Sequence, residues 1–204
     1  MPKGIPLTES ELDRRRGEIM DTAVRLFTEK GFNETSMRLI AEAAGVGKST
    51  LYDYFPSKDE ILIAYVLDEV RQVTRQAEQV IALDLGAGEK FRQILRRHMQ
   101  YMLANKAVFM RLTFETQRLS YESQQRIQKE RYAYQDMLSG LVRQGIRDGE
   151  FRAVNPLLAV RGMFSLLTAF IYTSRPTGTP DEMIQDAFDI LFLGLQTREE
   201  RGTK

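Results

Sequence analysis

The sequence predicts an all-α protein of about nine helices, because apolar residues recur at spacings of three and four along most of the chain. No segment combines the strict apolar–polar alternation of a strand with the turn spacing of a sheet protein. Helix-start signals add to this prediction: Asn155-Pro156 offers a cap followed by proline, and Thr179-Pro-Asp-Glu182 is a capping box. With 43% hydrophobic residues among 204, the chain can bury a substantial core.

The composition argues against several classes of protein. There is no cysteine and one histidine, so disulfides, thiolate chemistry and the usual metal clusters are poorly supplied. We therefore expect no catalytic residues, no cofactor and no metal. The sequence contains no run of about 18 uncharged apolar residues, so we expect no membrane partner. The first residues lack the apolar core of a signal peptide, which predicts a cytoplasmic protein.

The first 60 residues contain three predicted helices. The first spans residues 8–30, with an apolar stripe of Ile19, Ala23, Leu26 and Phe27, and Gly31-Phe32 closes it. Thr35 is the predicted N-cap of the second helix, and Gly45 ends it in a left-handed turn. The third helix runs from about Gly47 to Tyr54, and Pro56 stops it. Two short helices around a glycine turn have the form of a helix-turn-helix.

The residue pattern of the third helix predicts a polar outer face. Leu51 and Phe55 are the two inward residues, which leaves outward Lys48, Ser49, Thr50, Tyr52 and Asp53. Such a face suits a DNA groove and its phosphates, although a solvated helix of an ordinary bundle has the same pattern. The capping-box pattern Ser57-Lys-Asp-Glu60 places Lys58 in the first turn of the next helix, where a cation opposes the helix dipole. A nearby phosphate would remove that penalty.

Gly-Val-Gly-Lys-Ser-Thr (45–50) is similar to the end of a phosphate-binding P-loop, but the rest of that motif is missing. Glu42 stands where the first glycine is needed, and the preceding residues have a helical rather than a strand pattern. We therefore expect no nucleotide site here.

Residues 16–62 resemble the DNA-binding domain of TetR/AcrR-type transcriptional regulators. The shared features are Phe-x-x-x-Gly-Phe at the end of the first helix, Thr-Ser-x-x-x-Ile-Ala-x-x-Ala-Gly-Val through the second, Tyr-x-Tyr-Phe at the end of the third, and then Pro-Ser-Lys. The resemblance implies a helix-turn-helix domain over 1–56 and a helical ligand-binding and dimerisation domain over 57–204. It also implies a homodimer that binds a near-palindromic double-stranded operator, most commonly as a repressor, and that a small-molecule effector releases.

We expect DNA contacts from nine residues. Thr35, Ser36, Arg38, Thr50, Tyr52 and Lys58 are assigned to phosphates, and Lys48, Ser49 and Tyr54 to base edges or the adjacent backbone. Residues 1–60 nevertheless contain nine basic and eleven acidic side chains, a net of −2. Few phosphate contacts per subunit would make dimerisation important for affinity. Arg14 to Arg16 are either a solvated helix start or further phosphate contacts.

Beyond residue 57 the pattern predicts helices over 57–83, 89–103 and from about 124 to 147, with a short apolar segment over 106–114 and a polar stretch over 115–123. We expect an effector pocket for a small apolar or amphiphilic molecule, lined by His98, Met99, Met102, Phe109, Met110, Phe114, Glu115, Arg118, Tyr121, Tyr132 and Met163. Equally, these residues simply fill the core, and a lone histidine on an apolar face is more often a core residue than a ligand contact.

The helix over 156–174 is apolar nearly all round, and the last helix, from Pro180, has a broad apolar face. We expect a dimer interface on them, formed by Met163, Phe164, Leu167, Phe170, Ile171, Phe188, Leu191, Phe192 and Leu195, with burial inside one subunit as the alternative. Because no linker follows Pro56, we expect the 57–83 helix to transmit effector binding to the DNA domain. A helical-domain enzyme, with His98 and Glu115 as a minimal acid–base pair, and a protein-recruiting adaptor are the alternative functions.

Overall fold

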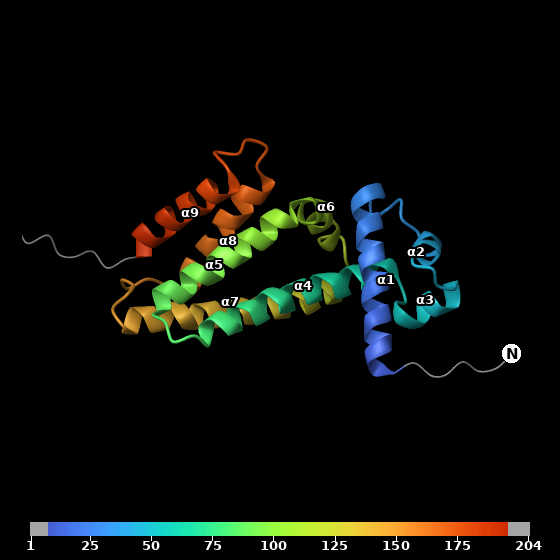
Figure 1. The fold of residues 1–204 in the computed structure, drawn as a ribbon, viewed down its shortest axis with the longest axis horizontal. Coiled ribbons are helices and arrows are strands. Elements are labelled where there is room, and N and C mark those ends of the chain that lie inside the picture. Colours follow the sequence, from blue (N-terminus) through green and yellow to red (C-terminus); the bar gives the residue numbers. More distant parts are fainter. Residues whose placement is uncertain (1–7, 196–204) are drawn as a thin grey trace, which may run out of the picture. The chain divides into compact units, whose positions relative to one another are not determined.

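The computed structural model describes residues 8–195, except for the side chain of Phe170. All nine elements in this range are α-helices, which confirms the predicted fold class (Figure 1). They are α1 (Glu9–Lys30), α2 (Met37–Ala43), α3 (Lys48–Tyr54), α4 (Lys58–Ile81), α5 (Ala87–Ala104), α6 (Lys106–Thr116), α7 (Tyr121–Arg147), α8 (Pro156–Tyr172) and α9 (Pro180–Leu195). None of these helices is long and apolar enough to cross a lipid bilayer.

The described chain forms two compact units. The first contains residues 8–68 and 110–127, and the second contains residues 69–109 and 128–195. Two helices, α4 and α7, therefore each contribute their N-terminal part to the first unit and the remainder to the second. The domain boundary that the sequence suggested after Pro56 stays a prediction.

In the first unit, α1 packs against α2 and α2 against α3 (Figure 1). Thr8 caps α1 in a capping box with Glu11: the Thr8 hydroxyl accepts from the Glu11 N–H, and the Glu11 carboxylate accepts from the Thr8 N–H. The predicted stripe of α1 is buried, and the Phe27 and Phe32 ring centroids lie 4.8 Å apart, so the closing turn packs back on the helix as expected.

The turn between α2 and α3 depends on Gly45. Its φ of 63° lies in the left-handed region, which costs glycine little. The Val46 N–H donates to the Ala41 carbonyl at 3.0 Å and the Gly45 N–H donates to Glu42 at 3.3 Å, which is the hydrogen-bond pattern of a Schellman closure. The turn fixes where α3 begins, and with it the direction in which the α3 side chains point.

In the second unit, α5, α8 and α9 pack on one another around a core rich in phenylalanine. Phe91, Phe151 and Phe192 meet with centroid separations of 6.0 to 6.3 Å. The segment that follows α7 ties two helix ends together. The Glu150 carboxylate accepts from the first N–H groups of α5, and Arg152 donates from its Nε to the Gly194 carbonyl near the end of α9.

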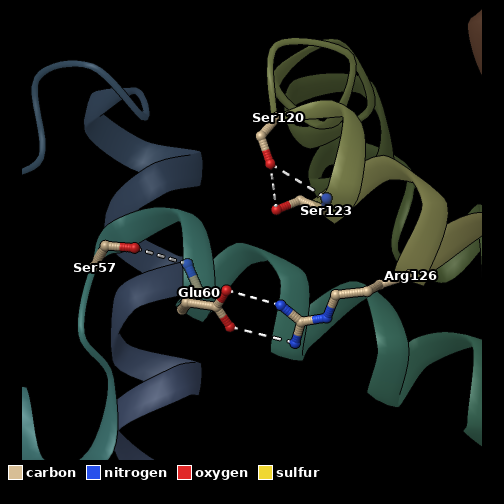
Figure 2. Close-up of polar contacts among 5 residues, drawn as sticks. All are labelled: Ser57, Glu60, Ser120, Ser123 and Arg126. Carbon is tan, nitrogen blue, oxygen red and sulfur yellow. Dashed lines mark hydrogen bonds and ion pairs between the residues drawn. The ribbon is translucent and has the colours of Figure 1, made fainter.

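Local start signals are confirmed in the last two helices. Asn155 caps α8 by accepting from the Leu158 N–H, and Pro156 is the first helical residue. Thr179 and Glu182 form the predicted capping box at α9. By contrast, the predicted box at α4 forms only in part: Ser57 accepts from the Glu60 N–H, but the Glu60 carboxylate turns to Arg126 (Figure 2).

Candidate nucleic-acid interface and ligand cavity

Helix α3 has the inward and outward faces that the sequence predicted. Leu51 is 0% exposed and Phe55, just after the helix, is 1% exposed, so both anchor α3 in the first unit. The outward residues are exposed: Lys48, Ser49, Thr50, Tyr52 and Asp53. Tyr54 is half-buried. The helix therefore presents donors and one aromatic ring on an accessible surface, as groove binding requires.

Lys48 and Tyr52 lie side by side on this surface. The Lys48 ammonium is 6.0 Å from the centroid of the Tyr52 ring, near the outer limit of a cation–π contact. Helix α2 adds Arg38, whose guanidinium is 3.3 Å from Glu42 in an exposed ion pair of the kind that contributes little to stability. Lys48 and Arg38 are therefore available for an external anion at small cost to the fold.

The basic run at the start of α1 has partners within the chain. Arg14 and Arg15 both reach Glu18, at 2.5 Å and 3.6 Å. The Arg16 guanidinium lies 4.6 Å from the centroid of the ring of Phe55, the buried residue that follows α3. The two interpretations of this run, solvated helix start and phosphate contact, stay open for Arg14 and Arg15, which are exposed or half-exposed.

Thr35 corrects one assignment. Its side chain is 0% exposed and its hydroxyl donates to the Gly31 carbonyl at 2.8 Å, so it is not available to hold a phosphate. The N-cap of α2 is the next residue, Ser36, whose hydroxyl accepts from the Leu39 N–H at 3.2 Å. The two adjacent hydroxyls therefore have different roles: that of Thr35 bonds to the preceding turn, and that of Ser36 caps α2. Ser36 is exposed and stays a candidate contact.

Lys58 is engaged inside the first unit. Its ammonium donates to the Phe32 carbonyl at 2.7 Å and lies 4.6 Å from the centroid of the Phe32 ring. These contacts supply the charge compensation for which the sequence suggested a phosphate. Lys58 therefore holds the turn after α1 to the start of α4, and a phosphate role for it stays a prediction.

A small cavity lies in the second unit, lined by Val73, Gln76, Ala77, Ile94, Arg97, His98 and Tyr134. These residues come from α4, α5 and α7. The cavity has a volume of about 10 Å³, which is room for roughly one water molecule. Its lining combines apolar side chains with an amide, a guanidinium, an imidazole and a phenol.

The polar end of this cavity is built on His98 and Tyr134. His98 Nδ1 and the Tyr134 hydroxyl are 3.1 Å apart, and their rings stack with centroids 5.8 Å apart. Phe164 packs edge-on against both rings. Burial lowers the pKa of His98 to about 4 and raises the pKa of Tyr134, so both groups are neutral at pH 7. The pair offers one neutral hydrogen-bonding edge and no charge.

The predicted pocket residues are divided between the two units, and their assignment to one pocket stays a prediction. Met110, Phe114, Glu115, Arg118 and Tyr121 belong to the first unit, whereas the other members belong to the second. Met99 and Met163 are 1% and 0% exposed in the core of the second unit, and Met102 and Phe109 are half-buried. Phe114, Tyr121 and Tyr132 are exposed at 62%, 79% and 49%, so they do not line an enclosed pocket.

Of the predicted members, only His98 is among the residues that line the cavity. The sequence analysis missed Gln76, Arg97 and Tyr134. Nothing in the helical pattern singled out these three residues as members of a pocket.

The suggested acid–base pair of an enzyme has other partners. His98 faces Tyr134, and the Glu115 carboxylate lies 3.5 Å from the guanidinium of Arg118, three residues later. His98 and Glu115 thus each have their own partner, and they belong to different units.

Most of the predicted dimer-interface residues are buried within one chain. Met163, Leu167, Ile171, Phe188, Phe192 and Leu195 are at most 5% exposed, Phe164 and Leu191 are half-buried, and the Phe170 side chain lies outside the described residues. The exposed large apolar side chains of α8 and α9 are instead Leu158, Ile190 and Leu193, at 68%, 62% and 72%. The most exposed apolar side chains that an interface on these helices could use are therefore this second set, next to the half-buried Phe164 and Leu191.

Comparisons with known proteins match most of the chain. Residues 19–65 match the family described as "Bacterial regulatory proteins, tetR family", and residues 84–195 match the "Tetracyclin repressor-like, C-terminal domain". The TetR family transcriptional regulator PfmR of Thermus thermophilus is 30% identical, with a TM-score of 0.73 over 88% of this chain and 99% of its own.

Two further similarities concern Bacillus subtilis. Its fatty acid metabolism regulator protein is 27% identical over 66% of this chain and 70% of its own length. The structure of its transcriptional regulator FadR in complex with stearoyl-CoA has a TM-score of 0.75 at 23% identity, covers 87% of this chain and 98% of its own, and supports the shared fold. With the helix-turn-helix geometry of α2 and α3 and matches over both parts of the chain, the protein belongs to the TetR/AcrR family of transcriptional regulators.

Proposed function

We propose that this regulator is a repressor that binds a near-palindromic operator as a homodimer and leaves it when an acyl-CoA or a similar amphiphile binds its helical body. The observation that carries the proposal is the exposed polar face of α3 on an apolar anchor, Leu51 and Phe55, within the family's DNA-binding region. On this account Lys48, Ser49 and Tyr54 meet base edges or adjacent backbone. Ser36, Arg38, Thr50 and Tyr52 hold phosphates.

Two DNA-binding heads, one from each subunit, are needed because a single head supplies little positive charge. The net of −2 over residues 1–60 limits the counterions that one subunit can release, so a second subunit must add its contacts. The exposed apolar residues Leu158, Ile190 and Leu193 on α8 and α9 support a pairing surface. A two-fold axis there would present two α3 helices to successive major grooves.

The effector class rests on the relatives and on the cavity. The relatives include a fatty acid metabolism regulator and a regulator solved with stearoyl-CoA. The cavity beside His98 and Tyr134 gives an apolar wall with a neutral hydrogen-bonding end, which suits the carbonyl end of an acyl chain, while Arg97 suits an anionic group.

The cavity is so small that effector binding requires the surrounding helices to move. Ligand sites usually enclose hundreds of Å³, whereas this cavity holds roughly one water molecule. An acyl chain therefore enters only if α4, α5 and α7 separate. Because α4 begins two residues after Pro56, without a flexible linker, its displacement changes the position of the DNA-binding head. The ligand shifts operator occupancy only by its preference for the opened form.

The test is a binding titration. A duplex selected from random DNA is labelled, and its affinity for the protein is measured by fluorescence anisotropy with and without saturating stearoyl-CoA, with free coenzyme A as the control. The proposal predicts an affinity at least about fivefold lower with stearoyl-CoA. Unchanged affinity would contradict the effector class, and the absence of any selected duplex would contradict operator binding.

A further inference from the structure

Glu60 and Arg126 form an ion pair between two helices that are distant in sequence. The guanidinium donates from Nη1 to Glu60 Oε1 at 2.8 Å and from Nη2 to Glu60 Oε2 at 3.4 Å (Figure 2). Glu60 lies in the first turn of α4, and Arg126 lies in the second turn of α7. Both belong to the first unit, so the contact holds the start of α7 against the start of α4.

The pair replaces a local contact that the sequence favours. In a complete capping box, the Glu60 carboxylate would return to the N–H of Ser57. Here Ser57 accepts from the Glu60 N–H at 3.2 Å, while the carboxylate reaches α7 instead (Figure 2). The side chains of Arg126 and Glu60 are 47% and 34% exposed, so water reaches the pair and it can break and re-form at modest cost.

The same two helices carry both the pair and the cavity. Beyond the first unit, α4 contributes Val73, Gln76 and Ala77 to the cavity, and α7 contributes Tyr134. Tyr134 lies about two helical turns beyond Arg126 on one uninterrupted helix. A displacement of α7 at Tyr134 therefore reaches Arg126, because a helix of this length moves as a stiff rod over two turns.

We propose that the Glu60–Arg126 pair is a coupling clasp, which conveys movement of α7 at the cavity to the first turn of α4 and so to the DNA-binding head. The inference rests on the proposed function, since it concerns how effector binding at the cavity changes the affinity for the operator. Without the clasp, α7 moves at the cavity and the first turn of α4 follows less. The expected result is a head that stays closer to its DNA-binding position when the effector is bound.

The size of the effect is bounded by the strength of the pair. An exposed ion pair changes an equilibrium by up to about fivefold. The clasp therefore supplies part of the coupling, and the continuous helix α4 supplies the remainder. Because the effect is a change in coupling, it is separable from a loss of stability, which would alter operator affinity with and without effector alike.

The experiment compares Arg126→Gln and Glu60→Gln with wild type in the anisotropy titration described above. Both variants should bind the operator like wild type without effector and release it about two- to fivefold less in saturating stearoyl-CoA. The double variant should release no less than either single one, and the exchanged pair Glu60→Arg with Arg126→Glu should regain part of the response. Lys129→Gln, which removes an exposed charge from the same helix, is the matched control.

The outcomes separate the two proposals. If wild type responds to stearoyl-CoA and both variants respond equally, the clasp is wrong and the proposed function stands. An equal loss of response in Lys129→Gln also overturns the clasp, since any charge removed from α7 would then suffice. If wild type binds no operator or ignores stearoyl-CoA, the proposed function fails and the clasp fails with it.

Discussion

The Glu150 carboxylate accepts a hydrogen bond from the Ala87 N–H at 2.8 Å, across 63 residues of sequence. A second bond from the Gly88 N–H, also at 2.8 Å, completes a cap on α5, whose own N-cap residue, Gly86, has no side chain to offer. A carboxylate at this position satisfies free N–H groups and complements the helix dipole. The segment after α7 therefore fixes where α5 begins.

Glu150→Ala should lower the free energy of unfolding by about 1–2 kcal/mol, because it removes the cap and leaves two N–H groups without their acceptor. Urea unfolding followed by circular dichroism measures the change. Asp148→Ala, in the same exposed turn, is the control and should leave stability within about 0.5 kcal/mol of wild type. Equal losses in the two variants would show that the cap contributes nothing specific.

Substitutions of Lys58 and Lys48 should have different effects, because Lys58 stabilises the fold and Lys48 is proposed to contact DNA. Lys58→Met removes a charge-assisted bond to the Phe32 carbonyl and should cost about 1–3 kcal/mol of stability. Lys48→Ala touches no buried group and should leave stability unchanged while it weakens operator binding about tenfold. Thermal unfolding and operator titration of both variants make the comparison. A stable Lys58→Met protein that has lost DNA binding would restore the phosphate role for Lys58.

His98 should make stability depend on pH. Its folded pKa of about 4 lies below the ordinary value of 6.5, so the unfolded chain takes up a proton between these values and the folded chain does not. Stability is therefore complete above about pH 6.5 and falls as the pH drops towards 4. At pH 4.5 the loss due to His98 should be on the order of 2 kcal/mol.

His98→Gln should remove this component. The measurement is the free energy of unfolding at pH 7 and pH 4.5 for wild type and variant, because carboxylates contribute equally to both proteins and cancel in the difference. Wild type should lose more stability on acidification than the variant. Identical losses would mean that His98 is protonated as easily in the folded chain as in the unfolded one.

The exposed apolar residues of α8 and α9 should hold two subunits together in a dimer. Leu193→Glu and Ile190→Glu should convert the proposed dimer into a stable monomer, because both side chains are exposed in one chain and add nothing to its core. Sedimentation equilibrium gives the mass, and circular dichroism shows whether the fold survives. Gln185→Glu adds the same charge elsewhere on α9 and should stay dimeric. A wild type that sediments as a monomer would rule out the pairing surface.

Local signals carried most of the prediction of the fold. The cap and proline before α8, the capping box at α9 and the Schellman turn at Gly45 each depend on residues within a few positions of one another. The inward pair Leu51 and Phe55 followed from helical spacing alone. Such features are determined by backbone geometry and periodicity, which a single sequence contains.

Partners distant in sequence could not be predicted. Lys58 bonds to a carbonyl 26 residues earlier, and Glu60 leaves its local capping box for Arg126, 66 residues later. The same limit explains the pocket and the interface. An apolar helix such as α8 shows that several sides are buried, but not which of them face the chain's own core, so Met163 and Leu167 were assigned to a partner that their burial excludes.

The central claim is that α3 reads DNA as one of a two-fold pair, and selection from random duplex DNA tests it most directly. Wild-type protein should enrich an inverted repeat with half-site centres about one helical turn, or a multiple of it, apart. Lys48→Ala should enrich it less strongly. Enrichment of no sequence by the folded wild-type protein at moderate salt would contradict the account.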